Sequence, residues 1–477
     1  MSVAERTLQA SFQRAVAAIL APTIDQPLAE ISAIILLVPI LLSIALWNGF
    51  PIIYYDTGAY MLEGLGHVFI AERSPVYSLF LAAAGARISF WSIAIVQALV
   101  TAYVITEFAR AVAPRMRLAS LVGIGVLLVA LTGVDWYVVE IEPDCMAALV
   151  ILSLYLLAFH ARMLGVFRSG LLILIAVLAT ASHSSHLGLA AGLTIVLALL
   201  RLAPFALRRV TAAMAVPNVG LPFSVFVLGL SLVLACNYDF TGQIFISRAG
   251  PVFVFARLLQ DGIVKQLLDD TCPAAHYKLC AYKDRLPARG DAWLWEKVSP
   301  FNALGRFKGT AAESQRIVVD SIARYPWAQA KAAIADTGRQ LVMFRTGDQI
   351  EPQEWVLFMP LDRLVPQQID AYLHARQQRG QIQFLAINAV DETVGVFSLL
   401  GLGVLLWRSA RRRDWNGFVL PAFIAVALVG NAAICGVFSG PHNRYQSRVI
   451  WLPTFVILLS VAQNAPFSLR KPIESGT

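Results

Sequence analysis

Long uninterrupted apolar runs recur along this chain, and they limit what it can fold into. A helix needs about 20 mostly apolar residues to cross the roughly 30 Å hydrocarbon layer of a membrane. Ten such runs are found, at 31–48, 90–110, 118–134, 145–161, 169–183, 186–203, 217–236, 390–407, 416–437 and 449–464. The sequence is only 14% charged, whereas soluble domains contain about 25% charged residues. We therefore predict an all-α polytopic membrane protein with ten transmembrane helices.

The placement of charged residues orients these spans. We treat residues 75–87 as a short interfacial or re-entrant helix, because a full span there would move the cluster Arg408–Arg413 to the outside. The loops on one side then hold most of the arginines, which is the pattern of cytoplasmic loops. Both termini are therefore predicted to be cytoplasmic. The net charge of +8 follows from this placement, so we predict no nucleic-acid partner.

The charge and hydropathy pattern divides the chain into five parts. They are an amphipathic N-terminal segment, spans one to seven with the first periplasmic loop, a periplasmic domain, spans eight to ten and a cytoplasmic tail, at 1–30, 31–236, 237–388, 389–464 and 465–477. A poorly ordered tail is the alternative for the first part. The periplasmic domain carries amphipathic runs at 303–324 and 326–345, so we expect it to be mostly helical. A disulfide between its Cys272 and Cys280 stays open, because a sequence does not supply the required geometry.

The first predicted periplasmic loop carries an acid among aromatic residues. Asp56 follows the first span closely, and a charged group beside a bilayer is usually functional or paired. A carboxylate there can take a proton from an acceptor hydroxyl, so Asp56 is the candidate catalytic base. Its alternative role is to cap a helix that begins near Thr57. The candidate substrate-binding residues of this loop are Tyr55, Tyr60, Glu72 and Arg73.

Three further outward loops hold carboxylates, imidazoles and guanidiniums. Arginine and histidine can neutralise a leaving phosphate, and aromatic rings offer sugars a flat apolar face. The candidate substrate-binding residues of these loops are Glu142, Asp144, His183, His186, His442, Arg444, Tyr445 and Arg448. Plainer roles stand beside these: the acids can be solvated or begin a helix, and Arg444 and Arg448, one helical turn apart, can snorkel to the surface.

The spacing of His183 and His186 would also suit a metal ion, because residues three apart share one face of a helix. No third ligand lies nearby in the sequence. We therefore predict no metal site at these residues. A divalent cation is left open as a cofactor of the protein.

Together these loops resemble the GT-C superfamily of polytopic glycosyltransferases, which includes protein mannosyltransferases and lipid A aminoarabinose transferases. The resemblance rests on Asp56, on the stretch 73–77 that leads into interfacial helices, on Pro143-Asp144 at the start of a span, and on the late pair Arg444-Tyr445. It implies a GT-C-like fold, a polyprenyl-phosphate sugar donor and an inverting reaction. The chain departs from many relatives in having a lone acid at this point of the first loop and its large loop between spans seven and eight.

We therefore expect a glycosyltransferase of the bacterial inner membrane, acting at the periplasmic face on a lipid, glycan or protein acceptor. Its partners would be the lipid-linked donor and membrane lipids, and its oligomeric state is not predicted. Two alternatives remain. A lipid or glycan transporter or flippase would need charged or helix-breaking residues near mid-span. A non-catalytic envelope-assembly subunit would use 237–388 for docking. The enzyme hypothesis requires the outward loops to meet in one pocket.

Overall fold

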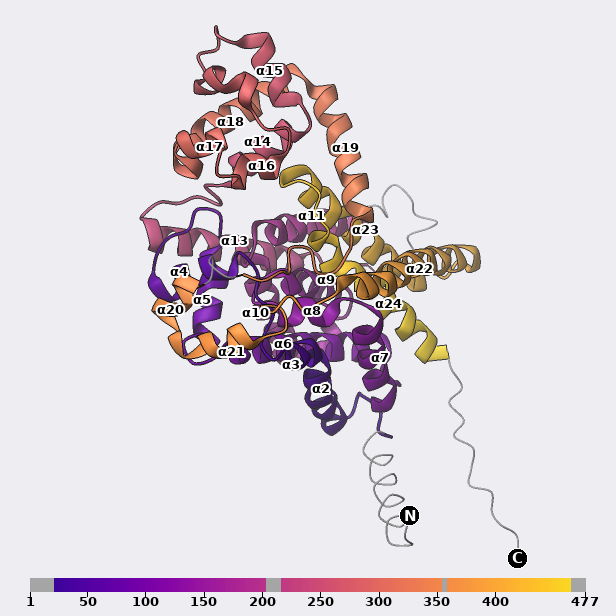
Figure 1. The fold of residues 1–477 in the computed structure, drawn as a ribbon. Coiled ribbons are helices and arrows are strands. Elements are labelled where there is room, and N and C mark those ends of the chain that lie inside the picture. The colour runs from indigo at the N-terminus through magenta and orange to yellow at the C-terminus, as the bar shows by residue number, and fades with distance from the viewer. Residues whose placement is uncertain (1–20, 203–215, 354–357, 465–477) are drawn as a thin grey trace, which may run out of the picture.

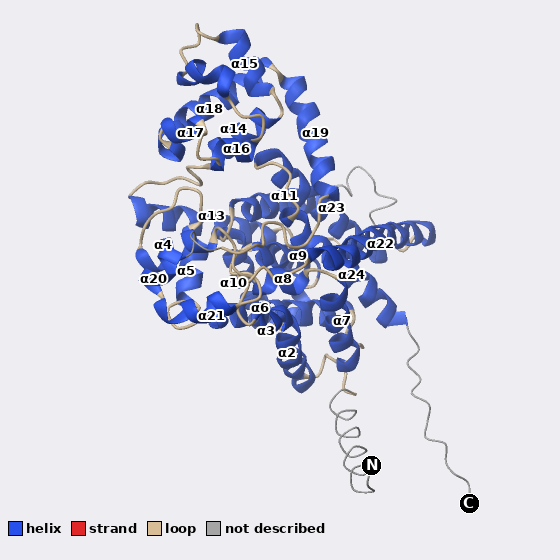
Figure 2. Ribbon diagram, in the orientation of Figure 1, coloured by secondary structure: helices blue, strands red, loops and turns tan. Residues whose placement is uncertain are grey.

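The protein is built of helices joined by loops (Figures 1 and 2). The computed structural model describes residues 21–202, 216–353 and 358–464. These ranges contain isolated β-bridges but no β-strand, so the predicted all-α class is confirmed for them. Most of the predicted N-terminal amphipathic segment and the whole tail 465–477 lie outside the described residues.

Eight helical segments are long and apolar enough to cross a membrane. They are α2 with α3 (Pro27–Leu41 and Ser43–Asn48), α6 (Phe90–Val112), α10 (Ala161–Ala181), α11 (Ser184–Leu202), α13 (Gly220–Thr241), α22 (Phe384–Arg412), α23 (Trp415–Phe438) and α24 (Arg444–Asn464). The chain is therefore a multi-pass membrane protein. The other two predicted spans form shorter helices, α7 (Leu118–Leu131) and α9 (Asp144–Phe159).

Helix α9 lies at the centre of the bundle. Every residue from Asp144 to Ala158 is buried, and the helix packs against α6, α10, α11 and α24. A helix that is hydrophobic on all sides needs an apolar environment all round, and here neighbouring helices provide it. This packing fixes Asp144, the first residue of α9, at one end of the bundle core.

Two short helices, α4 (Thr57–Gly66) and α5 (Pro75–Ala83), lie between α3 and α6. Helix α5 covers the stretch predicted to be interfacial, and its 9 residues are too few to cross a membrane. The two helices pack closely at Gly64, where a Cβ atom would overlap the backbone carbonyl of Ser78. The Ser78 hydroxyl also donates to Glu63 Oε2 at 2.6 Å. This contact holds the last turn of α4 against the first turn of α5, which follows Arg73 closely.

We expect Gly64→Ala to reduce the thermal stability of the protein. Its methyl group has no room against backbone atoms, and overpacking of this kind costs about 1–3 kcal/mol. Gly66→Ala is the matched control, since the nearest atom to a Cβ there is 3.9 Å away, on Val68. Thermal unfolding of both variants in detergent, followed by tryptophan fluorescence, checks this. Equal midpoints for the two variants would contradict the close approach of α4 and α5.

The polar stretch predicted as a single domain forms two parts. The first is a helical domain with its own core around Phe255, Trp293 and Phe301, drawn at the top of Figure 1. Its helices are α14 (Gly250–Gln260), α15 (Ile263–Thr271), α16 (Gly290–Trp295), α17 (Pro300–Ala303), α18 (Arg306–Arg324) and α19 (Pro326–Val342). Cys272 and Cys280 are joined by a disulfide in this domain. We call it the outer domain.

The second part returns to the bundle and packs beside the first loop. It contains α20 (Phe358–Leu364) and α21 (Ile369–His374), which Figure 1 shows next to α4 and α5. The Gln377 side chain forms two hydrogen bonds with the backbone of Ile53, and the Gln368 side chain accepts one from the backbone of Phe90. Residues just before Asp56 are therefore held by a segment more than 300 positions later in the chain.

Candidate functional site

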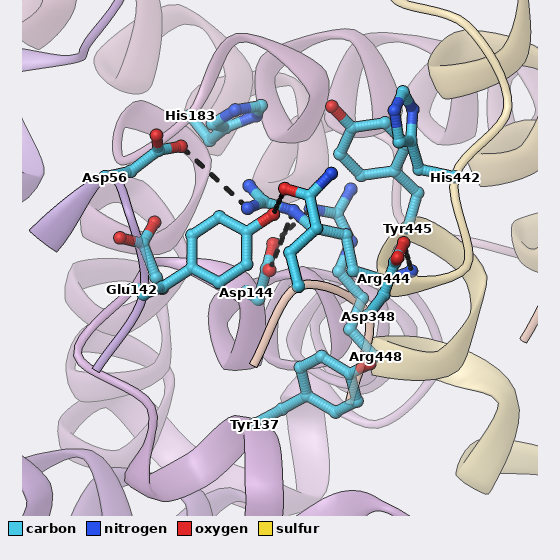
Figure 3. A network of polar contacts seen from close by, with 12 residues as sticks. Asp56, Tyr137, Glu142, Asp144, His183, Asp348, His442, Arg444, Tyr445 and Arg448 are labelled. Atoms are coloured by element: carbon cyan, nitrogen blue, oxygen red, sulfur yellow. Dashed lines mark hydrogen bonds and ion pairs between the residues drawn. The ribbon is translucent and has the colours of Figure 1, made fainter. Parts of the chain in front are cut away.

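Several helix ends meet at one end of the bundle. Helices α4, α9 and α24 begin there, and α10 ends there just before α11 begins. Figure 3 shows the result, with Asp56, Asp144, His183, Arg444 and Arg448 pointing toward one another from segments that are far apart in the sequence. The structure thus brings residues from all four predicted outward loops into one polar cluster, which we call the acid–arginine cluster.

Arg448 and Asp144 form the buried base of the cluster. Both side chains are fully buried, and Arg448 Nη1 lies 2.6 Å from Asp144 Oδ1. Arg448 Nη2 also donates to Ser185 Oγ at 3.0 Å and to Asn431 Oδ1 at 3.2 Å. A buried charge is tolerated when it is paired and hydrogen-bonded in this way. Arg448 therefore does not snorkel, because its charge is turned into the protein.

Arg444 lies between two carboxylates. Its Nε is 3.4 Å from Asp144 Oδ2, and its Nη1 is 3.8 Å from Asp56 Oδ2. The guanidinium stacks over the Tyr54 ring at 4.3 Å, and the Tyr54 hydroxyl donates to Gln349 Oε1 at 2.6 Å. The buried Nε has no hydrogen-bond partner among the described residues. Arg444 is thus held in place by rings and charges while part of its donor capacity stays unused.

Asp56 forms the accessible edge of the cluster. Its side chain is 18% exposed, and it forms an ion pair with Arg73 as well as the longer one with Arg444. Asp56 occupies the cap position of α4, but within the described ranges its side chain makes no capping hydrogen bond. The Asp56 carboxylate therefore pairs with the two arginines and does not cap α4.

Glu142 lies next to the start of α4, close to Asp56. It is fully buried, and its Oε1 lies 3.5 Å from the hydroxyl of Thr57, the first residue of α4. Burial, together with the charge of Asp56, raises the pKa of Glu142 well above its usual range. Burial thus disfavours the charged form of Glu142, in contrast to Asp144, which is paired with arginines.

A recess opens beside the cluster. It lies where the ends of α10 and α13 meet the starts of α5 and α11. Its polar wall includes Glu72, Arg73 and His183, and its apolar wall includes Pro75, Leu187 and Val233. The recess therefore joins charged groups of the cluster to apolar residues of the membrane helices.

Two candidate residues take part in other contacts. Tyr55 is partly exposed, and its hydroxyl donates to Glu351 Oε1 at 2.6 Å, so it is Tyr54 that faces Arg444. His442 Nε2 lies 3.2 Å from Asp291 of the outer domain. Burial alone would lower the pKa of His442, but the hydrogen bond and charge of Asp291 raise it above its ordinary value. His442 thus ties the loop before α24 to the outer domain.

The remaining candidates support the cluster. His186 is buried, and its Nδ1 bonds to the carbonyl of Ala179 at 3.0 Å. Tyr445 lies beside both cluster arginines of α24, with ring centre 5.4 Å from each guanidinium. Tyr60 packs beneath Arg73, whose guanidinium is 5.8 Å from the Tyr60 ring. These side chains position the charged groups and leave the recess to Glu72, Arg73 and His183.

Sequence reasoning missed Tyr54, Ser185 and Asn431 as partners of the arginines. Asn431 interrupts an apolar run, and a polar residue inside a predicted span was the available signal. Ser185 sits between two histidines in the sequence, but a serine at a helix start commonly serves as a cap. The bridge from Arg448 to Ser185 depends on the packing of α11 and α24 against the same two helices, α9 and α23, which no local pattern encodes.

Among the residues that the structure describes, no group of three or more His, Cys, Asp or Glu side chains is arranged to hold a metal ion. Comparisons of this chain with protein-family models, with curated proteins and with solved structures find no match. The resemblance to GT-C enzymes therefore stays a hypothesis that rests on the loop residues. The geometry of the acid–arginine cluster and of the recess beside it carries the functional argument that follows.

Proposed function

We propose that this chain is a glycosyltransferase that moves a sugar from a polyprenyl phosphate to an acceptor hydroxyl at the periplasmic surface of a bacterial inner membrane. The observation that carries the proposal is the position of Asp56, an accessible carboxylate between Arg73 and Arg444 beside a recess. Such transfer needs a base for the acceptor and cations for the leaving phosphate. Ten spans, cytoplasmic termini and a GT-C-like arrangement belong to the same proposal.

In the proposed reaction the acceptor hydroxyl gives its proton to the Asp56 carboxylate. The acceptor oxygen forms a bond to the anomeric carbon of the sugar, and the bond between that carbon and the phosphate oxygen breaks. The electron pair stays on the polyprenyl phosphate, which leaves with one more negative charge. Arg73 and Arg444 would hold this charge, since both already lie against the Asp56 carboxylate.

The arginines have donors to spare for a phosphate. A guanidinium carries five N–H groups, and buried Nε atoms of both Arg73 and Arg444 lack a hydrogen-bond partner among the described residues. When a phosphate takes the place of the Asp56 carboxylate at Nη2 of Arg73 and Nη1 of Arg444, Asp56 becomes available to the acceptor. Donor binding would thus uncover the base, so that acceptor activation follows donor binding.

The charges inside the spans do not favour the transporter alternative. Arg168 of α10 pairs with Glu30 of α2 at 2.7 Å and also with Glu107 of α6, although the sequence suggested a loop for Arg168. This group lies toward the other end of the bundle from Asp144. The intervening α9 spans about 24 Å without a charged residue from Cys145 to Phe159. The two charged regions are therefore separated by an apolar helix, and each is paired within itself.

The test follows the fate of the sugar. Purified protein in phospholipid vesicles receives a panel of polyprenyl-phosphate sugars with labelled sugar, together with an envelope extract that supplies acceptors. We expect the label to move into a covalent product while an equal amount of free polyprenyl phosphate appears. Movement of the intact labelled lipid across the vesicle without a product would support a transporter instead. If the label enters no product and the lipid does not cross the vesicle, the assembly-subunit alternative is supported instead.

The assay has a matched pair of variants. Arg444→Gln should reduce transfer by about 10²–10³-fold, the range for loss of one group that stabilises charge in a transition state. Arg345→Gln should keep transfer near the wild-type rate, because the Arg345 side chain is 63% exposed and pairs with Glu392. Similar losses of transfer in both variants would show that removing any positive charge lowers the rate, so that Arg444 has no specific role.

A further inference from the structure

The hydrogen bonds around His183 fix which ring nitrogen carries its hydrogen. The backbone N–H of Ser185 donates to His183 Nδ1 at 3.2 Å, and a backbone amide can only donate. Nδ1 must therefore present its lone pair, and in a neutral ring the hydrogen is then on Nε2. The tautomer follows from this single contact.

A second contact leads to the same tautomer. Ser185 Oγ lies 2.7 Å from His183 Nδ1 and accepts a hydrogen bond from Arg448 Nη2 at 3.0 Å. Because arginine has donors only, the serine hydroxyl uses a lone pair toward Arg448 and is free to donate its own hydrogen to Nδ1. A chain of hydrogen bonds therefore runs from buried Asp144 through Arg448 and Ser185 to His183.

The ring is neutral and faces the recess. Burial lowers the pKa of His183 to about 3, with the charges of Arg448, Arg444 and Arg73 acting in the same direction and only Asp144 opposing them. The His183 ring is therefore neutral near physiological pH and carries a single hydrogen. Its ring lines the recess together with Arg73, and Nε2–H is the polar group of the ring that Ser185 does not use.

We propose that His183 is a fixed neutral donor whose Nε2–H binds an oxygen of the phosphate of the lipid-linked donor in this recess. The assignment rests on the proposed function and adds a binding residue to it. A group that can only donate favours a ligand atom that can only accept, which describes an ionised phosphate oxygen, whereas a sugar hydroxyl both donates and accepts. Arg73 beside it supplies the positive charge that attracts the phosphate, and the His183 hydrogen bond orients the phosphate in the recess.

Two substitutions separate this role from helix capping. His183→Asn keeps an acceptor at the position of Nδ1 for the Ser185 amide, so that it preserves the start of α11, but it has no donor reaching the recess. His183→Gln places its amide nitrogen about where Nε2 lies. Binding is measured with geranylgeranyl phosphate in detergent, with geranylgeraniol and inorganic phosphate as comparison ligands.

We expect the asparagine variant to bind geranylgeranyl phosphate roughly tenfold or more weakly, the loss typical of one hydrogen bond to a charged group. The glutamine variant should bind within a fewfold of wild type, and geranylgeraniol should bind all three proteins alike. The reverse order, with asparagine strong and glutamine weak, would identify His183 as a cap and overturn the proposal. Equal binding by all three proteins, or a loss seen with geranylgeraniol too, would also overturn it.

The tautomer has its own readout. The chain contains 7 histidines, so nitrogen-15 spectra of histidine-labelled protein can be assigned for His183 with the glutamine variant. We expect an unprotonated Nδ1 and a protonated Nε2 that do not change between about pH 5 and 8, where an ordinary histidine titrates. Titration in that range, or a hydrogen on Nδ1, would refute the fixed donor. If these results hold while no sugar is transferred, the proposed function fails and this inference stands.

Discussion

Replacing Arg448 by methionine is expected to lower the free energy of unfolding by about 3–5 kcal/mol, the range for breaking a buried ion pair by removing one partner. Arg448 and Asp144 are both fully buried and 2.6 Å apart. Without the guanidinium, Asp144 keeps only Arg444 at 3.4 Å. Ser185 and Asn431 also lose the donor they share. Thermal or denaturant unfolding in detergent measures the loss.

Two controls show whether the loss comes from the uncompensated charge. Arg412→Met removes an exposed arginine at the end of α22 and should change stability by less than about 0.5 kcal/mol. The double variant Asp144→Asn/Arg448→Met removes both charges and should be more stable than Arg448→Met alone, because no unpaired carboxylate is left in the core. A double variant less stable than the single one would contradict this account of the pair.

The helices of the bundle could be predicted because hydrophobicity is a property of a local stretch of chain. Each of the ten apolar runs forms a helix close to its predicted bounds. The composition of an apolar run does not show whether protein or lipid surrounds the helix. Helix α9 is enclosed by protein, but a lipid-facing helix has a similar composition. Arg168 falls just outside the predicted span 169–183 and is therefore expected in a cytoplasmic loop. In the structure, Glu30 and Glu107 from two other helices compensate it.

The members of the site were easier to find than their partners. Asp56, Asp144 and Arg444 stood out because each is a charged group next to an apolar run. Which group each one contacts depends on the packing of distant helices, so the sequence could not supply it. Tyr55 illustrates the limit: it and Tyr54 are adjacent, and the direction of the backbone at the start of α4 decides that Tyr54 stacks on Arg444 while Tyr55 turns to Glu351.

The largest expected effect on activity is that of Asp56→Asn, which should reduce sugar transfer by about 10²–10⁴-fold, the usual contribution of a positioned general base. The amide keeps the shape of the side chain but cannot take a proton from the acceptor. Arg73 then loses its ion pair with Asp56 and Arg444 keeps only Asp144, so both arginines are more available to the donor phosphate. We therefore expect kcat to fall while KM for the lipid-linked donor stays the same or decreases, as measured by initial rates at varied donor concentration.

Asp135→Asn is the matched control for this variant. Asp135 is a buried acid of α8 (Val134–Val139) that accepts a hydrogen bond from Ser43 at 2.9 Å, and burial raises its pKa to about 8. It is therefore mostly protonated near neutral pH, and an amide resembles it closely, so transfer should stay near the wild-type rate. If Asp56→Asn kept transfer, Asp56 would not be the base. If it lost transfer through a higher donor KM at unchanged kcat, Asp56 would serve to orient the two arginines, and the proton would have to leave by another group.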